Sequence, residues 1–162
     1  MSTELPGIRV AIPGLSDHHF RHLLLDFNGT LARDGILLEG LRPILRKLGS
    51  RISVHVLTAD THGTVSHELG GEPLQLHILP SGNQAEAKVS ILHGLAADRI
   101  AIGNGSNDRL MLGEAELGIA LLEPEACSAK ALAAADIICV DIFRALELLS
   151  SPARLAATLR ES

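Results

Sequence analysis

The sequence contains no tryptophan, no tyrosine and three phenylalanines among its 162 residues. Proteins bind single-stranded nucleic acids largely through stacking on aromatic side chains, so this scarcity disfavours such ligands. Duplex nucleic acid is disfavoured as well, because the formal net charge is −5 and the basic residues form no cluster. We therefore expect no nucleic-acid partner.

The chain also lacks long apolar runs and paired cysteines. No run approaches the roughly 18 residues that a membrane-spanning helix requires, so we expect no membrane partner. Cys127 and Cys139 form no Cys-x-x-Cys pair and lie in apolar surroundings. Such cysteines are typical of reduced thiols in a cytoplasmic protein. The sequence therefore predicts a cytoplasmic location.

Aliphatic residues, by contrast, are plentiful. Hydrophobic residues make up 46% of the chain, which argues against disorder. A chain of this length has enough residues for one packed core without disulfide bonds. We expect a single domain over residues 1–162.

One stretch, residues 22–31, organises this interpretation. An apolar run ends abruptly in Asp26, and Asn28 and Gly29 follow. The run predicts a buried strand, and Gly29 provides the backbone freedom for a sharp turn after it. Open α/β sheets bind their ligands at the carboxyl ends of their strands. We therefore expect Asp26 to be the chemical centre of the protein.

Apolar strands alternate with helical patterns along the chain. We expect strands at 8–12, 22–27, 52–57, 74–79, 99–102, 117–122 and 137–140, and helices at 41–49, 64–69, 84–96, 108–115, 124–134, 141–149 and from 152 onward. This alternation predicts the α/β class, with a doubly wound, Rossmann-like parallel sheet and helices on both faces.

Several shorter segments have weaker signals. The Asp34-Gly35 pair predicts a type I′ turn in a small hairpin flap next to Asp26. The strand at 8–12 is expected to extend or cover the sheet edge, and residues 16–21 to form a polar connector. Alternation within 74–79 predicts an edge strand with His77 on a wet face.

The histidines of residues 18–22 could suggest a metal site. His18, His19 and His22 lie close together, but no cysteine or carboxylate completes a coordination set. A solvated loop is therefore the favoured interpretation.

Polar side chains follow three of the expected strands. Asp26, Thr58 and Asn104 each come after an apolar run, and Lys88 and Asp108 lie in the adjacent helices. The carboxyl ends of parallel strands point the same way, so these groups can meet in one crevice. A carboxylate, a hydroxyl and a cation suit phosphoryl transfer, in which Asp26 attacks phosphorus.

Such a reaction calls for a cation, because the charge of Asp26 repels a phosphate. A divalent metal ion and Lys88 would neutralise both groups. Mg²⁺ prefers a few protein oxygens plus water, and the predicted oxygens come from Asp26, the backbone carbonyl of Asn28, and Asn104 or Asp108. Thr58 and free N–H groups near Phe27 and Asn28 would donate to the phosphoryl oxygens.

These residues carry a family resemblance. Residues 26–31, Asp-Phe-Asn-Gly-Thr-Leu, resemble the first motif of the haloacid dehalogenase (HAD) superfamily, Asp-x-Asp-Gly-Thr-Leu. Thr58, Lys88 and residues 103–108 resemble its second, third and fourth motifs, in order. Residues 58–60 and 103–108 are also similar to motifs in the phosphorylation domain of P-type cation ATPases. The resemblance covers about residues 23–140.

The resemblance implies a stand-alone, P-type-ATPase-like HAD phosphatase. Scaffold elements fill the gaps between the motifs, so no cap domain is expected. It further implies Mg²⁺ as cofactor, an aspartyl-phosphate on Asp26, and phosphate binding by Thr58, Ala59 and Lys88. Its substrate would be a phosphorylated small molecule or macromolecule. The uncovered site also suggests closure by another subunit, and hence a homo-oligomer.

The chain departs from the superfamily pattern at two positions. Asn28 replaces the aspartate that serves as general acid and base, and Asn104 replaces a Mg²⁺-binding aspartate. An amide cannot shuttle a proton, a contribution typically worth about 10²–10⁴-fold in rate. A weakly active phosphate-binding or phospho-acceptor module is therefore an alternative. A nucleotide-binding domain is a weaker one, because Gly103-x-Gly105 lacks the third glycine of a dinucleotide loop.

Overall fold

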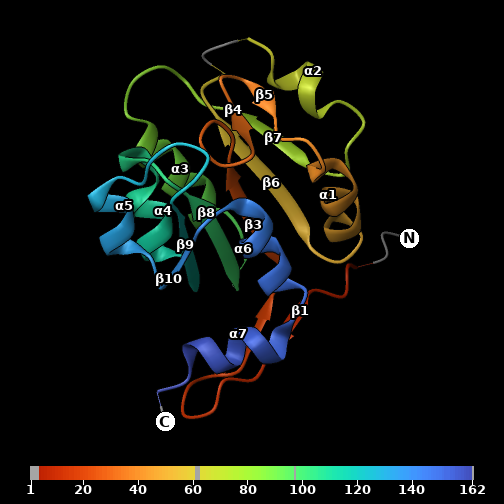
Figure 1. Cartoon of the computed structure of the whole chain (residues 1–162), viewed down its shortest axis with the longest axis vertical. Helices are drawn as coiled ribbons and strands as arrows, with labels where there is room; N and C mark the ends of the chain where they lie inside the picture. The colour runs from red at the N-terminus through yellow and green to blue at the C-terminus, as the bar shows by residue number, and fades with distance from the viewer. Residues whose placement is uncertain (1–3, 61–62, 97, 162) are drawn as a thin grey trace.

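The computed structural model describes residues 4–60, 63–96 and 98–161. Its centre is a six-stranded parallel sheet in the order β10-β9-β8-β3-β6-β7 (Figure 1). In that order the strands span Ile137–Cys139, Leu117–Leu121, Arg99–Gly103, His22–Asp26, Ser53–Thr58 and Gln75–Ile78. The predicted doubly wound parallel sheet is confirmed, and β3 lies inside it between β8 and β6.

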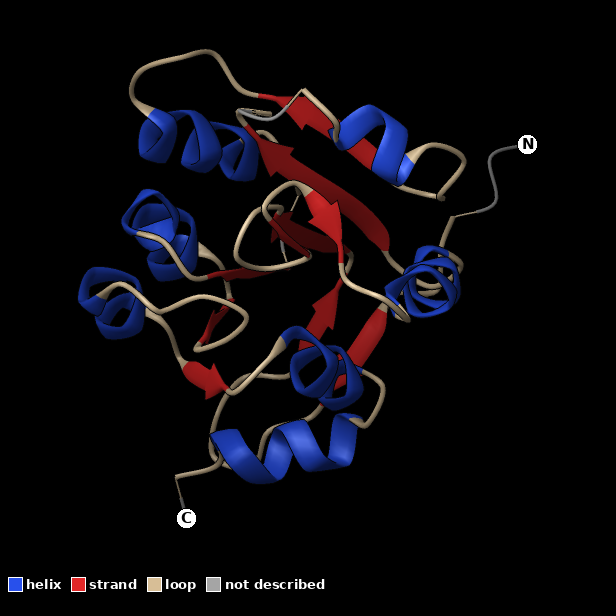
Figure 2. Cartoon of the chain, turned by 45° about the horizontal axis from the view of Figure 1, so that its top comes forward, coloured by secondary structure: helices blue, strands red, loops and turns tan. Residues whose placement is uncertain are grey.

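Helices cover both faces of this sheet (Figure 2). One core cluster contains residues of α1 (Leu41–Gly49), α2 (Val65–Leu69), α6 (Ile142–Leu149) and α7 (Pro152–Leu159). The other contains residues of α3 (Gln84–His93), α4 (Arg109–Glu114) and α5 (Ala129–Ala134). None of the helices in the described part of the chain combines the length and apolarity needed to cross a membrane.

The alternation of side chains along β3 supplies both cores. Leu23 and Leu25 belong to the first cluster, and Leu24 belongs to the second. Successive side chains of a strand point to opposite faces, so Asp26 shares the face of Leu24. This is the face that α3 covers, and α3 carries Lys88.

The first strand does not join the main sheet. β1 (Ile8–Val10) pairs antiparallel with β2 (His18–Phe20) in a separate two-stranded sheet. The expected strand is therefore present at Ile8–Val10 but does not extend the main sheet, and the expected connector at 16–21 is wrong because β2 lies within it. Ile8 and Phe20, which are paired in register, are fully buried, so apolar packing stabilises a strand inside a stretch that is polar in sequence.

The predicted flap is present. β4 (Ala32–Arg33) and β5 (Ile36–Leu37) form a hairpin joined by Asp34 and Gly35. Their φ angles are 51° and 78°, and a type I′ turn needs positive φ at both positions. The segments between the motifs contain this hairpin, α1, β6, α2 and β7, so the chain has no cap domain at these points.

The expected helix over 124–134 begins five residues late. α5 starts at Ala129, and the side chain of Ser128 accepts a hydrogen bond from the Lys130 N–H at its first turn. Residues 122–128 form a loop instead. The serine cap defines the helix start here more strongly than the earlier proline does.

Three histidines form a hydrogen-bonded row across β3, β6 and β7. Nδ1 of His22 lies 3.1 Å from Nε2 of His55, and Nδ1 of His55 lies 3.1 Å from Nε2 of His77. β7 is an edge strand as predicted, but His77 is half-buried rather than on a wet face. Among the described residues, no three His, Cys, Asp or Glu side chains are arranged to hold a metal ion. Burial lowers the pKa of all three histidines, and that of His55 falls to about 4.

We expect the free energy of unfolding to fall as the pH drops from about 6.5 towards 4. In this range the unfolded His55 takes up a proton that the folded one does not, which favours unfolding. A shift from 6.5 to about 4 corresponds to about 3 kcal/mol. Urea unfolding on both sides of this range measures the loss, which should be smaller in His55→Leu. His67→Leu changes an exposed histidine and should keep the wild-type dependence. Equal acid sensitivity of His55→Leu and wild type would contradict this account.

Candidate active site

Asp26 ends β3 at the carboxyl edge of the sheet and is buried. Its Oδ1 accepts a hydrogen bond from Nζ of Lys88 at 2.6 Å. Its Oδ2 has a longer contact, 3.4 Å, with the hydroxyl of Thr30, which donates to it. One carboxylate oxygen is thus held firmly and the other only weakly.

Lys88 joins this carboxylate to a second one. Its Nζ also donates to Oδ1 of Asp108 at 2.6 Å, and both side chains are essentially inaccessible to solvent. The other oxygen of Asp108 accepts hydrogen bonds from the backbone N–H groups of Asn104 and Gly105, at 3.0 and 2.9 Å. Asp108 therefore fixes the turn after β8 and also holds Lys88.

The buried charges shift one another's titration. Burial and the nearby Asp108 carboxylate raise the pKa of Asp26 to about 7, although Lys88 acts in the opposite direction. Burial alone would lower the pKa of Lys88, but the two carboxylates outweigh it and raise that pKa above its ordinary range. Lys88 is therefore cationic at neutral pH, and a further cation near Asp26 would favour its anionic form.

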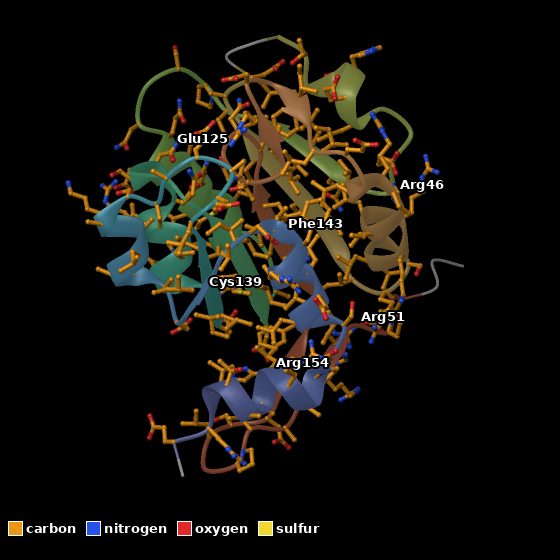
Figure 3. All side chains as sticks on the ribbon, viewed as in Figure 1. Arg46, Arg51, Glu125, Cys139, Phe143 and Arg154 are labelled. Carbon is orange, nitrogen blue, oxygen red and sulfur yellow. The ribbon has the colours of Figure 1, made fainter. Side chains whose placement is uncertain are left out.

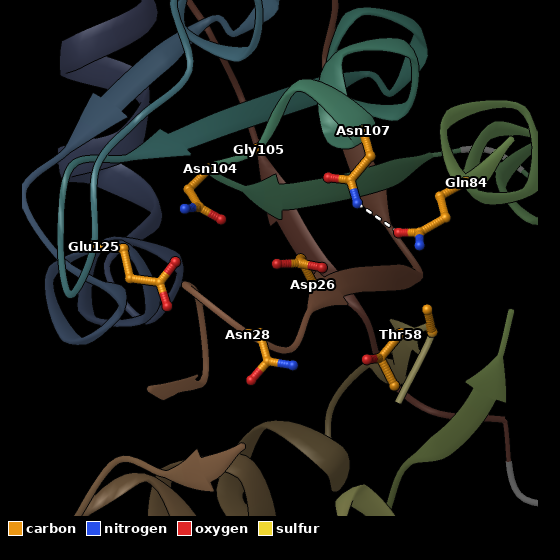
Figure 4. A pocket seen from close by; sticks show the side chains of 9 residues that line it. Asp26, Asn28, Thr58, Gln84, Asn104, Gly105, Asn107 and Glu125 are labelled. Atoms are coloured by element: carbon orange, nitrogen blue, oxygen red, sulfur yellow. Dashed lines mark hydrogen bonds between the residues drawn. The ribbon is translucent and has the colours of Figure 1, made fainter. Parts of the chain in front are cut away.

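A pocket of about 270 Å³ lies over Asp26 (Figure 4). It is lined by Asp26, Asn28, Thr58, Ala59, Gln84, Asn104, Gly105, Asn107 and Glu125. Five of the seven predicted site residues thus line one pocket. The other two, Lys88 and Asp108, are buried next to Asp26. The structure brings all seven together, while their chemical roles stay predictions.

Several hydrogen-bond donors at this pocket have no acceptor within the part of the chain that the structure describes. Oγ1 of Thr58 accepts from the Asp60 N–H at 3.1 Å, which leaves its own hydroxyl hydrogen available. Within the described residues, the backbone N–H groups of Asn28 and Ala59 donate no hydrogen bond. Free donors that converge in this way are suited to the oxygens of an anion.

Asn28 connects the loop after β3 to the flap. Its Oδ1 accepts a hydrogen bond from the Gly35 N–H at 2.9 Å. The amide oxygen is therefore committed to the hairpin, and the NH₂ group of Asn28 is the part that can serve a ligand in the pocket.

Asn104 connects the turn after β8 to the loop before α5. Its Nδ2 donates to the carbonyl of Ala126 at 2.9 Å, so its Oδ1 is the atom left for a ligand. Gly29 passes close beside it, because a Cβ there would lie 2.6 Å from Nδ2 and 2.7 Å from Oδ1 of Asn104. Gly29 also has a φ of +81°, so both conformation and space require glycine at this position.

The donor set fits a hard divalent cation. The carboxylate of Asp26, the backbone carbonyl of Asn28 and Oδ1 of Asn104 supply oxygens from residues that line the pocket. Asp108, the alternative ligand to Asn104, does not line the pocket and has both oxygens engaged. Its role as a ligand stays a prediction, and the geometry favours Asn104 of the two.

Four residues that line the pocket were not predicted as site residues: Gln84, Gly105, Asn107 and Glu125. Nδ2 of Asn107 donates to Oε1 of Gln84 at 2.7 Å, and together they form one wall of the pocket. Asn107 lies in the same turn as Asn104, and this position could have identified it as a site residue from the sequence. Glu125 lies after β9, where the rule of polar residues following strands also applies, but the expected helix over 124–134 concealed it.

Solved structures that share this fold include proteins described as HAD hydrolases. Another is 3-deoxy-D-manno-octulosonate 8-phosphate phosphatase from Moraxella catarrhalis, in complex with a magnesium ion, a phosphate ion and KDO. It is 17% identical to this chain, with a TM-score of 0.61, and the match covers 82% of this chain and 87% of that one. A zinc-transporting PIB-type ATPase is 21% identical with a TM-score of 0.57, over 75% of this chain and 20% of that one. The fold is that of the HAD superfamily, as the motif resemblance implied.

A sequence relative gives a more specific relationship. The chain is 41% identical over 85 residues to the uncharacterized protein MJ0073 of Methanocaldococcus jannaschii, a match that covers 49% of this chain and 91% of that protein. No known protein-family profile matches the chain. The chain belongs to the same family as this archaeal protein.

We expect Lys88→Met to destabilise the protein at neutral pH. The substitution leaves Asp26 and Asp108 buried without their shared cation, and breaking a buried pair in this way costs about 3–5 kcal/mol. Chemical denaturation measures the change in the free energy of unfolding. Lys47→Met, at an exposed position of α1, should be near neutral. Adding Asp108→Asn to Lys88→Met should recover part of the loss, because it removes one uncompensated charge. A loss no larger in Lys88→Met than in Lys47→Met would contradict the proposed importance of this pair.

Proposed function

We propose that this protein is a Mg²⁺-dependent phosphohydrolase that acts on a phosphomonoester through an aspartyl-phosphate on Asp26. The main support for this proposal is that Asp26, held by Lys88, lies beneath a pocket lined with free hydrogen-bond donors. The fold it shares with HAD phosphatases supports the proposal, and one of these was crystallised with magnesium and phosphate.

The pocket residues divide into ligands for the cation and donors for the phosphate. Asp26, the Asn28 carbonyl and the Asn104 amide oxygen would hold Mg²⁺. When bound, Mg²⁺ offsets the negative charges of the carboxylate and the phosphate, so that the two can approach. Thr58 and the N–H group of Ala59 would donate to phosphoryl oxygens.

In the first step Asp26 is the nucleophile. Lys88 holds Oδ1, which leaves Oδ2 to form the bond to phosphorus while the bond to the ester oxygen breaks. In the second step water attacks phosphorus, the bond to Asp26 breaks, and phosphate is released. The hydrogen-bond donors stabilise the charge that develops on the phosphoryl oxygens in both steps.

The site is not covered by a cap, so the substrate class stays broad. A phosphorylated small molecule and a phosphorylated group on a macromolecule would both reach the pocket. We infer a cytoplasmic enzyme, and a second copy of the chain could close the site in a homo-oligomer.

A second candidate function is a phospho-acceptor or phosphate-binding regulatory module. Asn28 favours it, because the general acid and base of the resembled family is replaced there by an amide that binds the flap. Such a module would take up phosphate once per site and release it slowly.

Asp26→Asn should abolish turnover. We expect Mg²⁺-dependent hydrolysis of p-nitrophenyl phosphate to fall by roughly 10³-fold or more, since the variant cannot form the covalent intermediate. Acid-quenched labelling should trap a phosphoenzyme in wild type and none in the variant. Asp17→Asn, at an exposed position on another part of the surface, is the matched control. Full activity in Asp26→Asn would rule out the mechanism.

Asn28→Asp should raise turnover. A carboxyl group here can give a proton to the leaving oxygen, and the aspartate can still accept the hydrogen bond from Gly35. We expect a larger gain with glycerol phosphate, whose alkoxide needs a proton, than with p-nitrophenyl phosphate, whose leaving group does not. An unchanged or lower rate with both substrates would show that proton transfer at this position does not limit turnover.

A further inference from the structure

The loop between β9 and α5 brings a carboxylate to the pocket that the resemblance does not assign. Glu125 lines the pocket on the side of Asn28 and Asn104, and its carboxylate is directed toward the space between them (Figure 4). Figure 3 places Glu125 at the end of the molecule that carries the flap, opposite Arg154 on α7. Glu125 is therefore part of the site rather than of the general surface.

The backbone on both sides of Glu125 is anchored. The guanidinium of Arg33, in the flap, donates to the carbonyl of Pro124, and Nδ2 of Asn104 donates to the carbonyl of Ala126 at 2.9 Å. Both donors belong to elements that shape the pocket. The position of Glu125 is thus tied to the flap and to the turn after β8.

The loop is also fixed further along. The Ser128 N–H donates to the carbonyl of Asn104 at 2.8 Å, and the hydroxyls of Ser106 and Ser128 lie 2.6 Å apart. Before Pro124, the Glu123 N–H donates to the Val140 carbonyl at 2.7 Å. Hydrogen bonds to three parts of the fold therefore keep this segment in one position without the help of a helix.

The carboxylate of Glu125 itself is free. In residues 4–60, 63–96 and 98–161 it has no hydrogen-bond or salt-bridge partner, whereas Asp26 and Asp108 are both bound to Lys88. A side chain without a structural partner can exchange a proton with a ligand at no cost in internal hydrogen bonds.

Elimination leads to the same residue. The other polar side chains that line the pocket are the nucleophile Asp26, the hydroxyl of Thr58 and four amides, those of Asn28, Gln84, Asn104 and Asn107. Amides do not accept protons at neutral pH, and a hydroxyl is a poor base. Among the described residues that line the pocket, Glu125 alone combines proton-accepting chemistry with freedom from the first reaction step.

We propose that Glu125 is the general base for the second step, in the place of the carboxylate that Asn28 lacks. This inference rests on the proposed function. Glu125 accepts a proton from a water molecule, the water oxygen forms a bond to phosphorus, and the bond from phosphorus to the Asp26 oxygen breaks. The proton then passes from Glu125 to solvent or to the departing phosphate, which restores both carboxylates.

Glu125→Gln should slow the loss of the phosphoenzyme without slowing its formation. The probe is acetyl [³²P]phosphate with Mg²⁺, whose acetate leaving group needs no proton. Labelling is followed by a chase with unlabelled acetyl phosphate and acid quenching. We expect labelling to proceed at the wild-type rate and the dephosphorylation rate to fall by roughly 10²–10⁴-fold. A wild-type dephosphorylation rate in the variant would overturn the proposal.

Matched variants separate a chemical role from a structural one. Glu123→Gln changes an exposed carboxylate in the same loop that does not line the pocket, and it should dephosphorylate at the wild-type rate. Asn28→Asp combined with Glu125→Gln should restore much of the lost rate, because a carboxylate again faces the pocket. An equal defect in Glu123→Gln, or no rescue by Asn28→Asp, would assign the effect to loop structure and overturn the proposal.

The same labelling distinguishes this inference from the function on which it rests. If wild type forms no Asp26-dependent phosphoenzyme and shows no turnover, the phosphohydrolase proposal fails and the role of Glu125 fails with it. If wild type is labelled and turns over while Glu125→Gln behaves like wild type, only the general-base assignment fails.

Discussion

The buried ammonium of Lys88 is the interaction on which the site and the surrounding fold both depend. Removing three charged groups from water costs several kcal/mol for each ion, which is recovered only through close pairing. Lys88 meets Asp26 and Asp108 at 2.6 Å each, and these partners come from β3 and from the 3₁₀ turn η1 (Ser106–Asp108). The pairing therefore requires α3, β3 and the turn after β8 to be in one mutual position. The contacts that hold these three elements together are therefore also the contacts that form the site.

The loops at the sheet edge extend this constraint outward. Gly29 is packed so closely against Asn104 that no side chain fits between the two loops. Asn104 in turn anchors the Ala126 carbonyl, while Asn28 anchors Gly35 of the flap. Each loop is thus held by a side chain of a neighbouring loop. Precise placement of pocket groups follows from this mutual bonding, although most of the loops have no regular secondary structure of their own.

Local rules made the sheet and the seven candidate residues predictable from sequence. Asp26, Thr58 and Asn104 follow apolar strands, and a parallel sheet brings such positions together at one edge. The missed features depend on bonds between segments far apart in the chain. Pro124 favours a helix start locally, but the bonds from Arg33 and Asn104 keep its segment as a loop. β2 is a separate case: it pairs with the preceding strand β1, and the burial of Phe20 opposite Ile8 is not evident from a local sequence that is mostly polar.

Hydrogen bonding and charge account for asparagine, rather than aspartate, at positions 104 and 28. Asn104 must donate to a carbonyl, which a carboxylate cannot do, so the amide secures the loop while its oxygen stays available. No such requirement applies at position 28, because asparagine and aspartate can both accept the hydrogen bond from the Gly35 N–H. The difference between the two residues at position 28 is their charge. The pKa of Asp26 is already raised to about 7, and a further carboxylate beside it would raise this pKa more. Glu125 is exposed at the pocket rim, where water weakens its repulsion of Asp26. A base in that position keeps proton-accepting chemistry in the pocket and leaves the nucleophile easier to ionise.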